Sequence, residues 1–169
     1  MSRLSWRASL KRVLKHLTES EPGYRIAVLG LGSEEWGDDA AGMIVARRLK
    51  RRRSQHENIY VIDAGTMPEN FSGYLRKVAP NFILMIDATR AGKDPGSIRW
   101  IDLRDVDGIS AFTHGLPLSV QANYLRDELG CEVGLIGIEG ASFNFGEPVS
   151  LPVRRAVNNV VRALAWLLV

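Results

Sequence analysis

The sequence has almost no cysteine and no long apolar run, and each absence excludes a class of protein. Cys131 is the single cysteine among 169 residues, so no disulfide can form within the chain, and we expect a cytoplasmic protein. No stretch reaches the roughly 18 consecutive apolar residues of a membrane-spanning helix. The first 17 residues carry charges throughout, which is not typical of a secretory signal. We therefore expect neither a membrane span nor export.

Acidic side chains are absent from the first 18 residues, which contain five basic ones. The chain has a net charge of +3, so its remainder sums to −2, and we do not expect a nucleic-acid-binding protein. A second basic run, residues 47–53, ends a predicted helix, where cations interact favourably with the helix dipole. Two interpretations of these segments stay open: a solvated face, or a docking patch for an acidic or nucleic-acid partner.

Apolar runs alternate with helical patterns along the chain. Strands are predicted over 24–29, 59–62, 82–86, 98–103 and 132–138, and helices over 4–17, 38–52, 68–78, 118–129 and 151–168. This order is typical of a three-layer α/β fold, in which helices cover both faces of a mostly parallel twisted sheet. A turn at Asp94-Pro95-Gly96 allows the strand that follows to be an antiparallel edge. We expect residues 1–22 to be a basic amphipathic extension and residues 23–169 a single domain.

Carboxylates follow each of the first three predicted strands: Asp38 and Asp39, then Asp63, then Asp87. Ligands of open α/β sheets bind at this carboxyl edge. If the fold brings Asp39, Asp87 and His114 together, two oxygens and one nitrogen would suit a borderline divalent metal such as nickel or zinc. Each residue also has a structural interpretation. Asp38 and Asp39 would equally suit the capping of the following helix, Asp87 a strand-end aspartate that bonds a nearby backbone amide, and His114 a structural histidine.

The glycine loop Gly30-Leu31-Gly32 differs from a nucleotide-binding turn. It lacks the third glycine of G-x-G-x-x-G, and no G-K-[ST] follows. The acids Glu34, Glu35, Asp38 and Asp39 that come next would repel a phosphate. We expect the glycines to give the backbone its turns and to let the next helix pack closely on the sheet.

Four segments together resemble the hydrogenase maturation endopeptidases, which trim the C-terminal peptide from the large subunit of [NiFe] hydrogenases. The resemblance spans residues 24–169, in order and with compatible spacing. Its four blocks are residues 30–42 (GLGSEEWGDDAAG), 61–70 (VIDAGTMPEN), 87–99 (DATRAGKDPGSIR) and 113–118 (THGLPL). An aspartate in the first block, where some members carry glutamate, is most similar to the branch that acts on hydrogenase 3.

The resemblance implies a function and a site. The family's metal-contacting residues fall on Asp39, Asp87 and His114, and Asp38 is a candidate second catalytic carboxylate. The implied enzyme is an endopeptidase, aspartic-type by family classification, that removes the C-terminal extension of a [NiFe] hydrogenase large-subunit precursor after nickel insertion. The nickel is presented by that substrate, with zinc or another divalent ion as a surrogate. We expect a monomer when free, and a metal-bound or carboxylate-activated water as the attacking group.

Two residues depart from the family pattern, and other functions stay open. Arg90 stands where many members are acidic, and Glu139 stands where a glutamine is common; both are expected near the site. The main alternative is a non-catalytic, nickel-dependent chaperone that binds the same precursor. A nucleotide-binding α/β enzyme is the third interpretation.

Overall fold

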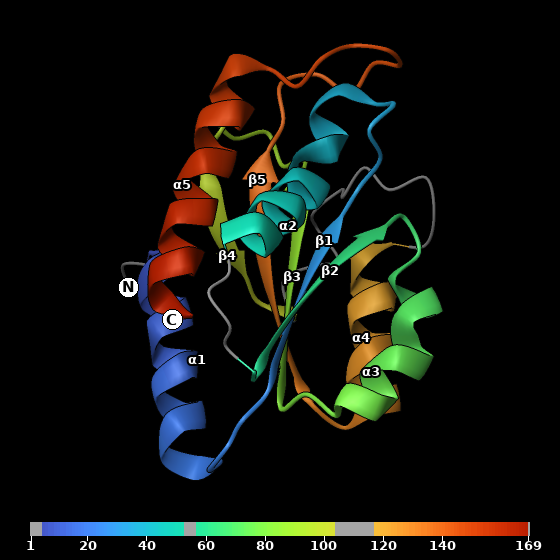
Figure 1. Cartoon of the computed structure of the whole chain (residues 1–169). Helices are drawn as coiled ribbons and strands as arrows, with labels where there is room; N and C mark the ends of the chain where they lie inside the picture. Colours follow the sequence, from blue (N-terminus) through green and yellow to red (C-terminus); the bar gives the residue numbers. More distant parts are fainter. Residues whose placement is uncertain (1–4, 53–56, 104–116, 169) are drawn as a thin grey trace.

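Five strands form one twisted sheet at the centre of the structure, a computed structural model that describes residues 5–52, 57–103 and 117–168 (Figure 1). The strands are β1 (Ile26–Leu31), β2 (Ile59–Gly65), β3 (Phe82–Thr89), β4 (Ile98–Ile101) and β5 (Glu132–Glu139). Their order across the sheet is β2-β1-β3-β5-β4, with β4 antiparallel to β5 and the other pairs parallel. The predicted mostly parallel sheet with an antiparallel edge strand is confirmed.

The strand order reverses between β1 and β3. From β1 the chain crosses outward to β2, then returns to the other side of β1 as β3. In such sheets the connections that follow the two central strands run to opposite sides, and ligands bind outside the carboxyl ends of these strands. The topology therefore points to the place where β1 meets the glycine loop and where β3 carries Asp87.

Three parallel strands are longer than predicted. The apolar runs end at Leu29, Ile62 and Ile86, but strand pairing continues to Leu31, Gly65 and Thr89. Strand pairing needs only backbone groups, so polar and small residues can extend it past the buried run. Asp63 and Asp87 consequently belong to the strands themselves and have the fixed side-chain directions of a strand.

Helices cover both faces of the sheet. On one face lie α1 (Trp6–Ser20), α2 (Ala41–Arg52) and α5 (Leu151–Leu167), and on the other lie α3 (Ser72–Val78) and α4 (Leu118–Leu129) (Figure 1). Short 3₁₀ turns, η1 (Gly37–Ala40) and η2 (Pro68–Phe71), lead directly into α2 and α3. The three-layer architecture is as predicted.

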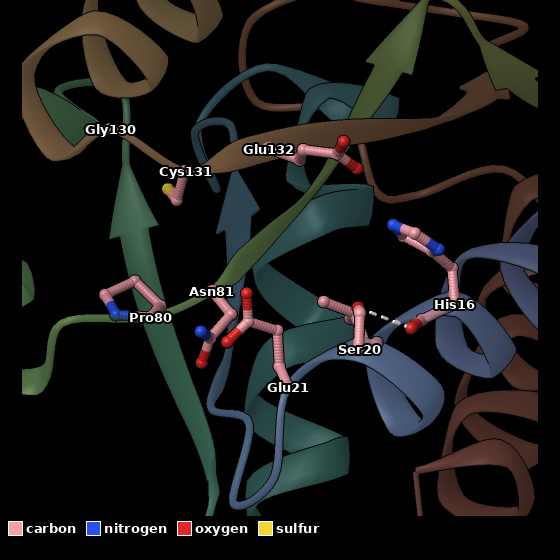
Figure 2. A pocket seen from close by; sticks show the side chains of 9 residues that line it. His16, Ser20, Glu21, Pro80, Asn81, Gly130, Cys131 and Glu132 are labelled. Atoms are coloured by element: carbon pink, nitrogen blue, oxygen red, sulfur yellow. Dashed lines mark hydrogen bonds between the residues drawn. The ribbon is translucent and has the colours of Figure 1, made fainter.

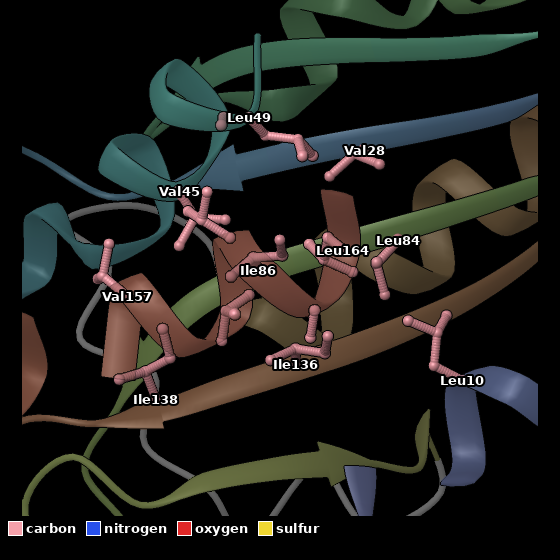
Figure 3. Close-up of a cluster of buried hydrophobic side chains, with 14 of the residues drawn as sticks. Leu10, Val28, Val45, Leu49, Leu84, Ile86, Ile136, Ile138, Val157 and Leu164 are labelled. Carbon is pink, nitrogen blue, oxygen red and sulfur yellow. The ribbon is translucent and has the colours of Figure 1, made fainter. Parts of the chain in front are cut away.

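The larger core lies under α1, α2 and α5. Val28, Ile86 and Ile136 of the strands pack there with side chains of all three helices, among them Leu10, Val45 and Leu164 (Figure 3). Leu10 of α1 is fully buried, and burial of a leucine contributes about 1.5–3 kcal/mol. The amphipathic helix predicted in the N-terminal extension is thus packed into the common core. None of the helices within the described part of the chain is long and apolar enough to span a membrane.

Candidate functional site

The predicted carboxylates meet at the carboxyl edge of the sheet. Asp87 is in β3, beside the point where the strand order reverses, and pairs with Gly137 of β5. Asp39 is in η1, the turn that follows the glycine loop of β1. Both side chains are almost completely buried, with 1% of Asp87 and none of Asp39 exposed.

Three glycines allow η1 and the start of α2 to approach the sheet closely, which brings Asp39 to the strand edge that carries Asp87. A Cβ atom on Gly42 would lie 2.1 Å from the Ile86 carbonyl oxygen and 2.4 Å from that of Leu31. A Cβ on Gly30 would lie 2.1 Å from the Gly42 carbonyl oxygen. Gly32 has a φ of +125°, and its Cβ would overlap the Asp39 carbonyl. The expected role of these glycines in close helix–sheet packing is confirmed.

Asp87 has little compensation for its charge. Its Oδ1 accepts a hydrogen bond of 2.8 Å from the Ala88 N–H, whereas the buried Oδ2 accepts none from any residue that the structure describes. Burial raises the pKa of the Asp87 carboxyl well above its usual range, and repulsion from Asp39 raises it further. The Ala88 hydrogen bond opposes this shift only in part. Such a carboxyl either holds a proton or requires a cation.

Asp39 is held in place by the glycine loop. Its Oδ2 accepts a hydrogen bond of 2.8 Å from the Ser33 N–H. Asp39 lies near enough to Asp87 for its charge to raise the pKa of the Asp87 carboxyl. The structure therefore brings two of the three predicted metal-contacting residues to one place.

His114, the third predicted metal contact, lies outside the described residues. The described chain resumes at Pro117, just before α4. Among residues 5–52, 57–103 and 117–168 no group of three potential histidine, cysteine or carboxylate ligands can hold a metal ion. The contribution of His114 stays a prediction.

Asp38, the neighbour of Asp39, is fully buried and its carboxylate is saturated with donors. It accepts hydrogen bonds from the N–H groups of Ala141, Ser142 and Ser150, and from the Ser150 hydroxyl, at 2.6–3.1 Å. These donors belong to the β5–α5 connection and to the residue before α5. Asp38 therefore does not cap the following helix with its side chain, because its carboxylate bonds to the β5–α5 connection and to Ser150. The capping alternative for Asp39 stays a prediction.

Glu139 is a buried carboxylate whose structural role the sequence did not indicate. It ends β5 and accepts hydrogen bonds from the Thr89 hydroxyl and from the N–H groups of Ala91 and Lys93, at 2.8–3.1 Å. The Arg99 guanidinium lies 3.7 Å away. Glu139 thus holds the β3–β4 connection in place beside the site. The sequence showed only that Glu139 replaces a glutamine common in the family and did not predict this structural role.

Two further residues lie at this edge of the sheet. Arg90, the other departure from the family pattern, places its guanidinium 4.7 Å from the ring centre of Phe143, in the β5–α5 connection. Gln121 of α4 donates to the Thr66 carbonyl across 3.3 Å, and its own amide oxygen is buried without a hydrogen-bond partner among the described residues. The sequence did not indicate that Gln121 belongs to this edge, because it placed this residue only in the first turns of a predicted helix.

Cys131 lies at the opposite end of the sheet. It borders a pocket with His16, Ser20 and Glu132, at the amino ends of β3 and β5 (Figure 2). Burial raises the pKa of the Cys131 thiol to about 11, so the thiolate is scarce at neutral pH. A cysteine nucleophile for the site at the carboxyl edge is therefore excluded by position and by chemistry.

A sequence model of one family, described as hydrogenase maturation protease, matches residues 43–167, which is most of the chain. The chain belongs to the hydrogenase maturation protease family. The hydrogenase 3 maturation protease of Escherichia coli strain K12 is 35% identical over 138 residues, covering 81% of this chain and 86% of that protein. A putative hydrogenase maturation protease of Methanocaldococcus jannaschii is 32% identical over 149 residues, covering 83% of this chain and 88% of that protein.

Solved structures of the family have the same fold. The crystal structure of the [NiFe] hydrogenase maturation protease HycI from Thermococcus kodakarensis aligns with a TM-score of 0.79 at 29% identity, covering 92% of this chain and 98% of that one. The crystal structure of a hydrogenase 3 maturation protease aligns with a TM-score of 0.71 at 33% identity, covering 82% of this chain and 88% of that one. The predicted family and fold are confirmed, and the chain is a hydrogenase maturation protease.

Proposed function

We propose that this protease removes the C-terminal extension of a [NiFe] hydrogenase large-subunit precursor, and that it does so only after nickel has been inserted. The nickel belongs to the substrate and is the feature that the site recognises. Asp39, Asp87 and His114 are the residues that contact it. The free enzyme is a monomer that acts in the cytoplasm.

The observation that supports this proposal is the buried Asp87 carboxylate, which lies beside the charge of Asp39 and has little compensation for its own charge. Two buried carboxylates repel each other, and Asp87 Oδ2 lacks a donor among the described residues. A divalent cation removes the repulsion and supplies the missing partner, and an imidazole beside two carboxylate oxygens suits nickel or zinc. A substrate that carries nickel is therefore bound more tightly than one without it, which makes cleavage depend on metal insertion.

Hydrolysis of a peptide bond requires a water whose proton is accepted as it attacks the carbonyl carbon. We assign this role to Asp87, because its Oδ2 accepts no hydrogen bond from any described residue and so keeps lone pairs available for the proton of the water. The proton passes to the leaving nitrogen as the C–N bond breaks, so the products are a new carboxylate and a free amine. A carboxylate has lone pairs on two oxygens, so one side chain can contact the metal and accept this proton.

Asp38 contributes differently in this scheme. Its four hydrogen bonds leave no free acceptor directed at a substrate, and removing its charge would release the β5–α5 connection. We assign Asp38 the task of holding the loop that carries Asp39 against the β5–α5 connection. The general base is then Asp87 and not Asp38.

The test is mass spectrometry of the cognate large-subunit precursor, incubated with and without nickel loading at one enzyme per hundred precursor molecules. We expect loss of a C-terminal peptide only from the nickel-loaded precursor. Cleavage that ignores nickel would keep the protease and refute the recognition role of the pair. Stoichiometric binding without turnover would instead indicate the chaperone.

Variants assign the result to the site. Asp87→Asn and His114→Ala are expected to abolish processing of the nickel-loaded precursor. Asp127→Asn makes the same chemical change as Asp87→Asn on the exposed surface of α4, where Asp127 pairs with Arg126, and should process normally. Undiminished processing by His114→Ala would remove that residue from the site.

A further inference from the structure

The three helices on one face of the sheet carry most of the positive charge of the chain. α1 contains four lysines and arginines, α2 contains five and α5 contains three, against Glu19 as the single acid in the three helices. The layer therefore has a charge of +11, whereas the whole chain has +3, which leaves −8 on the remainder. The molecule has one strongly basic face, here called the basic layer (α1, α2 and α5; Figure 1).

Few of these cations are neutralised. Among the described residues, only Lys15 and Arg47 of the basic layer form an ion pair with a carboxylate, Lys15 with Glu19 and Arg47 with Glu34 and Asp63. Most of the others are exposed. Repulsion among so many unpaired cations lowers stability, so the layer has no evident benefit for the fold itself.

The helix dipole explains only part of the pattern. Lys50, Arg51 and Arg52 lie in the last turn of α2, where cations are favourable. Arg7, however, is the second residue of α1, and Arg154 and Arg155 follow closely on the start of α5, where the dipole disfavours cations. These arginines lie where local helix energetics would place acids.

A groove runs between α1 and α5 within this layer. It is lined by Arg7 and Lys11 from α1 and by Arg162 and Trp166 from α5. Trp166 is 71% exposed, the largest exposure among the large apolar side chains described. The Lys11 ammonium lies 5.1 Å from the centre of its ring.

We propose that this groove binds an acidic segment of a partner protein, with carboxylates on Arg7, Lys11 and Arg162 and an apolar side chain against the edge of Trp166. Guanidinium groups bind carboxylates through paired hydrogen bonds. Because Lys11 covers a face of Trp166, the ring is poorly placed to stack on a nucleic-acid base. A membrane surface is disfavoured because the site is concave and Trp166 is the one large apolar side chain that it exposes among the described residues.

This interaction goes beyond the proposed cleavage. The groove lies on the α1/α5 side of the sheet, while Asp87 and Glu139 point to the α3/α4 side at its carboxyl edge. Binding to the groove and hydrolysis at the site are therefore separable, and one can fail while the other holds.

The test uses a fluorescein-labelled peptide of ten glutamates with one central leucine, measured by fluorescence anisotropy at 50 and 150 mM salt. The groove variant reverses the charge of all three cations that line the groove, Arg7→Glu/Lys11→Glu/Arg162→Glu. Its matched control, Arg76→Glu/Lys77→Glu/Arg126→Glu, makes the same change of net charge on α3 and α4. We expect the groove variant to lose at least tenfold in affinity and the control to lose less than threefold.

Trp166→Ala tests whether the groove contributes more than its charge, since this variant keeps every cation. We expect it to lower the affinity for the peptide severalfold. Equal losses in the two charge-reversed variants would overturn the proposal, because net charge would then suffice. Tighter binding of a labelled ten-nucleotide single-stranded DNA would overturn it in favour of nucleic acid. Phosphatidylserine vesicles that the peptide fails to displace would overturn it in favour of a membrane.

Discussion

Replacing Asp87 by asparagine should make this protease more stable while it abolishes activity. Asp87 is buried, its Oδ2 has no hydrogen-bond partner among the described residues, and Asp39 repels it. Asparagine keeps the size of the side chain and an oxygen for the Ala88 N–H, but removes the charge. The substitution therefore removes an unfavourable interaction and leaves the favourable one in place.

The size of the effect follows from the burial and from the neighbouring charge. A buried, poorly solvated polar group costs about 1–3 kcal/mol, and each unit of pKa displacement corresponds to about 1.4 kcal/mol. We expect Asp87→Asn to raise the free energy of unfolding by about 1–3 kcal/mol at pH 7. For a chain of this size that is about 2–12 °C in melting temperature.

The pH dependence gives the prediction its sign. The folded pKa of Asp87 is raised above its unfolded value, so its carboxyl favours the folded state below about pH 4, and this contribution is lost as the pH rises through the folded pKa. The advantage of the asparagine variant should therefore be small near pH 4 and large near pH 8. Urea unfolding of the metal-free proteins at both pH values measures it.

Asp38→Asn is the matched control, because it makes the same change one residue from Asp39 in an equally buried carboxylate. Asp38 accepts four hydrogen bonds, and an amide cannot accept all of them. We expect this variant to lose about 2–4 kcal/mol of stability at pH 7, the range of two or three charge-assisted hydrogen bonds. Destabilisation by Asp87→Asn at pH 8, or equal effects of the two variants, would refute the assignment of an uncompensated charge to Asp87.

Three further predictions concern Gly42 and Glu139 near the site and Cys131 at the opposite end of the sheet. Gly42→Ala would place a Cβ 2.1 Å from the Ile86 carbonyl oxygen, so it should lower stability by about 3 kcal/mol in urea unfolding and reduce cleavage more than a distant variant of equal stability. Glu139→Gln keeps an acceptor for the backbone of the β3–β4 connection but loses its charge, so stability should fall by about 1–2 kcal/mol, with faster hydrogen exchange in that connection. The thiol of Cys131 has a pKa of about 11, so iodoacetamide should label it at pH 8 at least tenfold more slowly than free cysteine and leave cleavage unaffected; rapid labelling with loss of activity would contradict this.

The sequence predicted the fold well because the fold depends on local patterns. Apolar runs located all five strands, and helical periodicity located the helices to within a few residues. The ends of β1, β2 and β3 were missed, since ladder hydrogen bonds extend past the apolar run and leave no trace in hydropathy. Asp87 was expected at the very end of its strand, but strand pairing continues for two more residues, to Thr89.

The site could be predicted only as a set of candidate residues. Spacing and resemblance indicated Asp38, Asp39 and Asp87 together, but the three carboxylates differ in ways that depend on distant partners. Ser150, which donates twice to Asp38, is 112 positions away along the chain. No local sequence pattern encodes that contact. Sequence alone therefore could not distinguish Asp38, which accepts four hydrogen bonds, from Asp87, whose Oδ2 accepts none among the described residues.

The basic layer was missed for a similar reason. Residues 1–18 and 47–53 stood out as basic segments, whereas three arginines spread along 151–167 did not. The fold places α1, α2 and α5 on one face of the sheet, and their basic side chains form a single positively charged surface only because of this arrangement.

Asp38 and Asp39 are neighbours in the sequence, but they have different roles. The hydrogen bonds of Asp38 hold the turn in the position that keeps Asp39 close to Asp87, despite their repulsion. The hydrogen bonds to Asp38 fasten η1 to the β5–α5 connection, and the glycine contacts press the same turn onto β1 and β3. A less constrained turn would move Asp39 away from Asp87, because separation relieves their repulsion. The fold must therefore be rigid here in order to keep two like charges together, and it is this enforced proximity that gives a cation something to neutralise. A site that bound metal by removing built-in repulsion would need no permanently held ion, which agrees with our proposal that the substrate brings the metal.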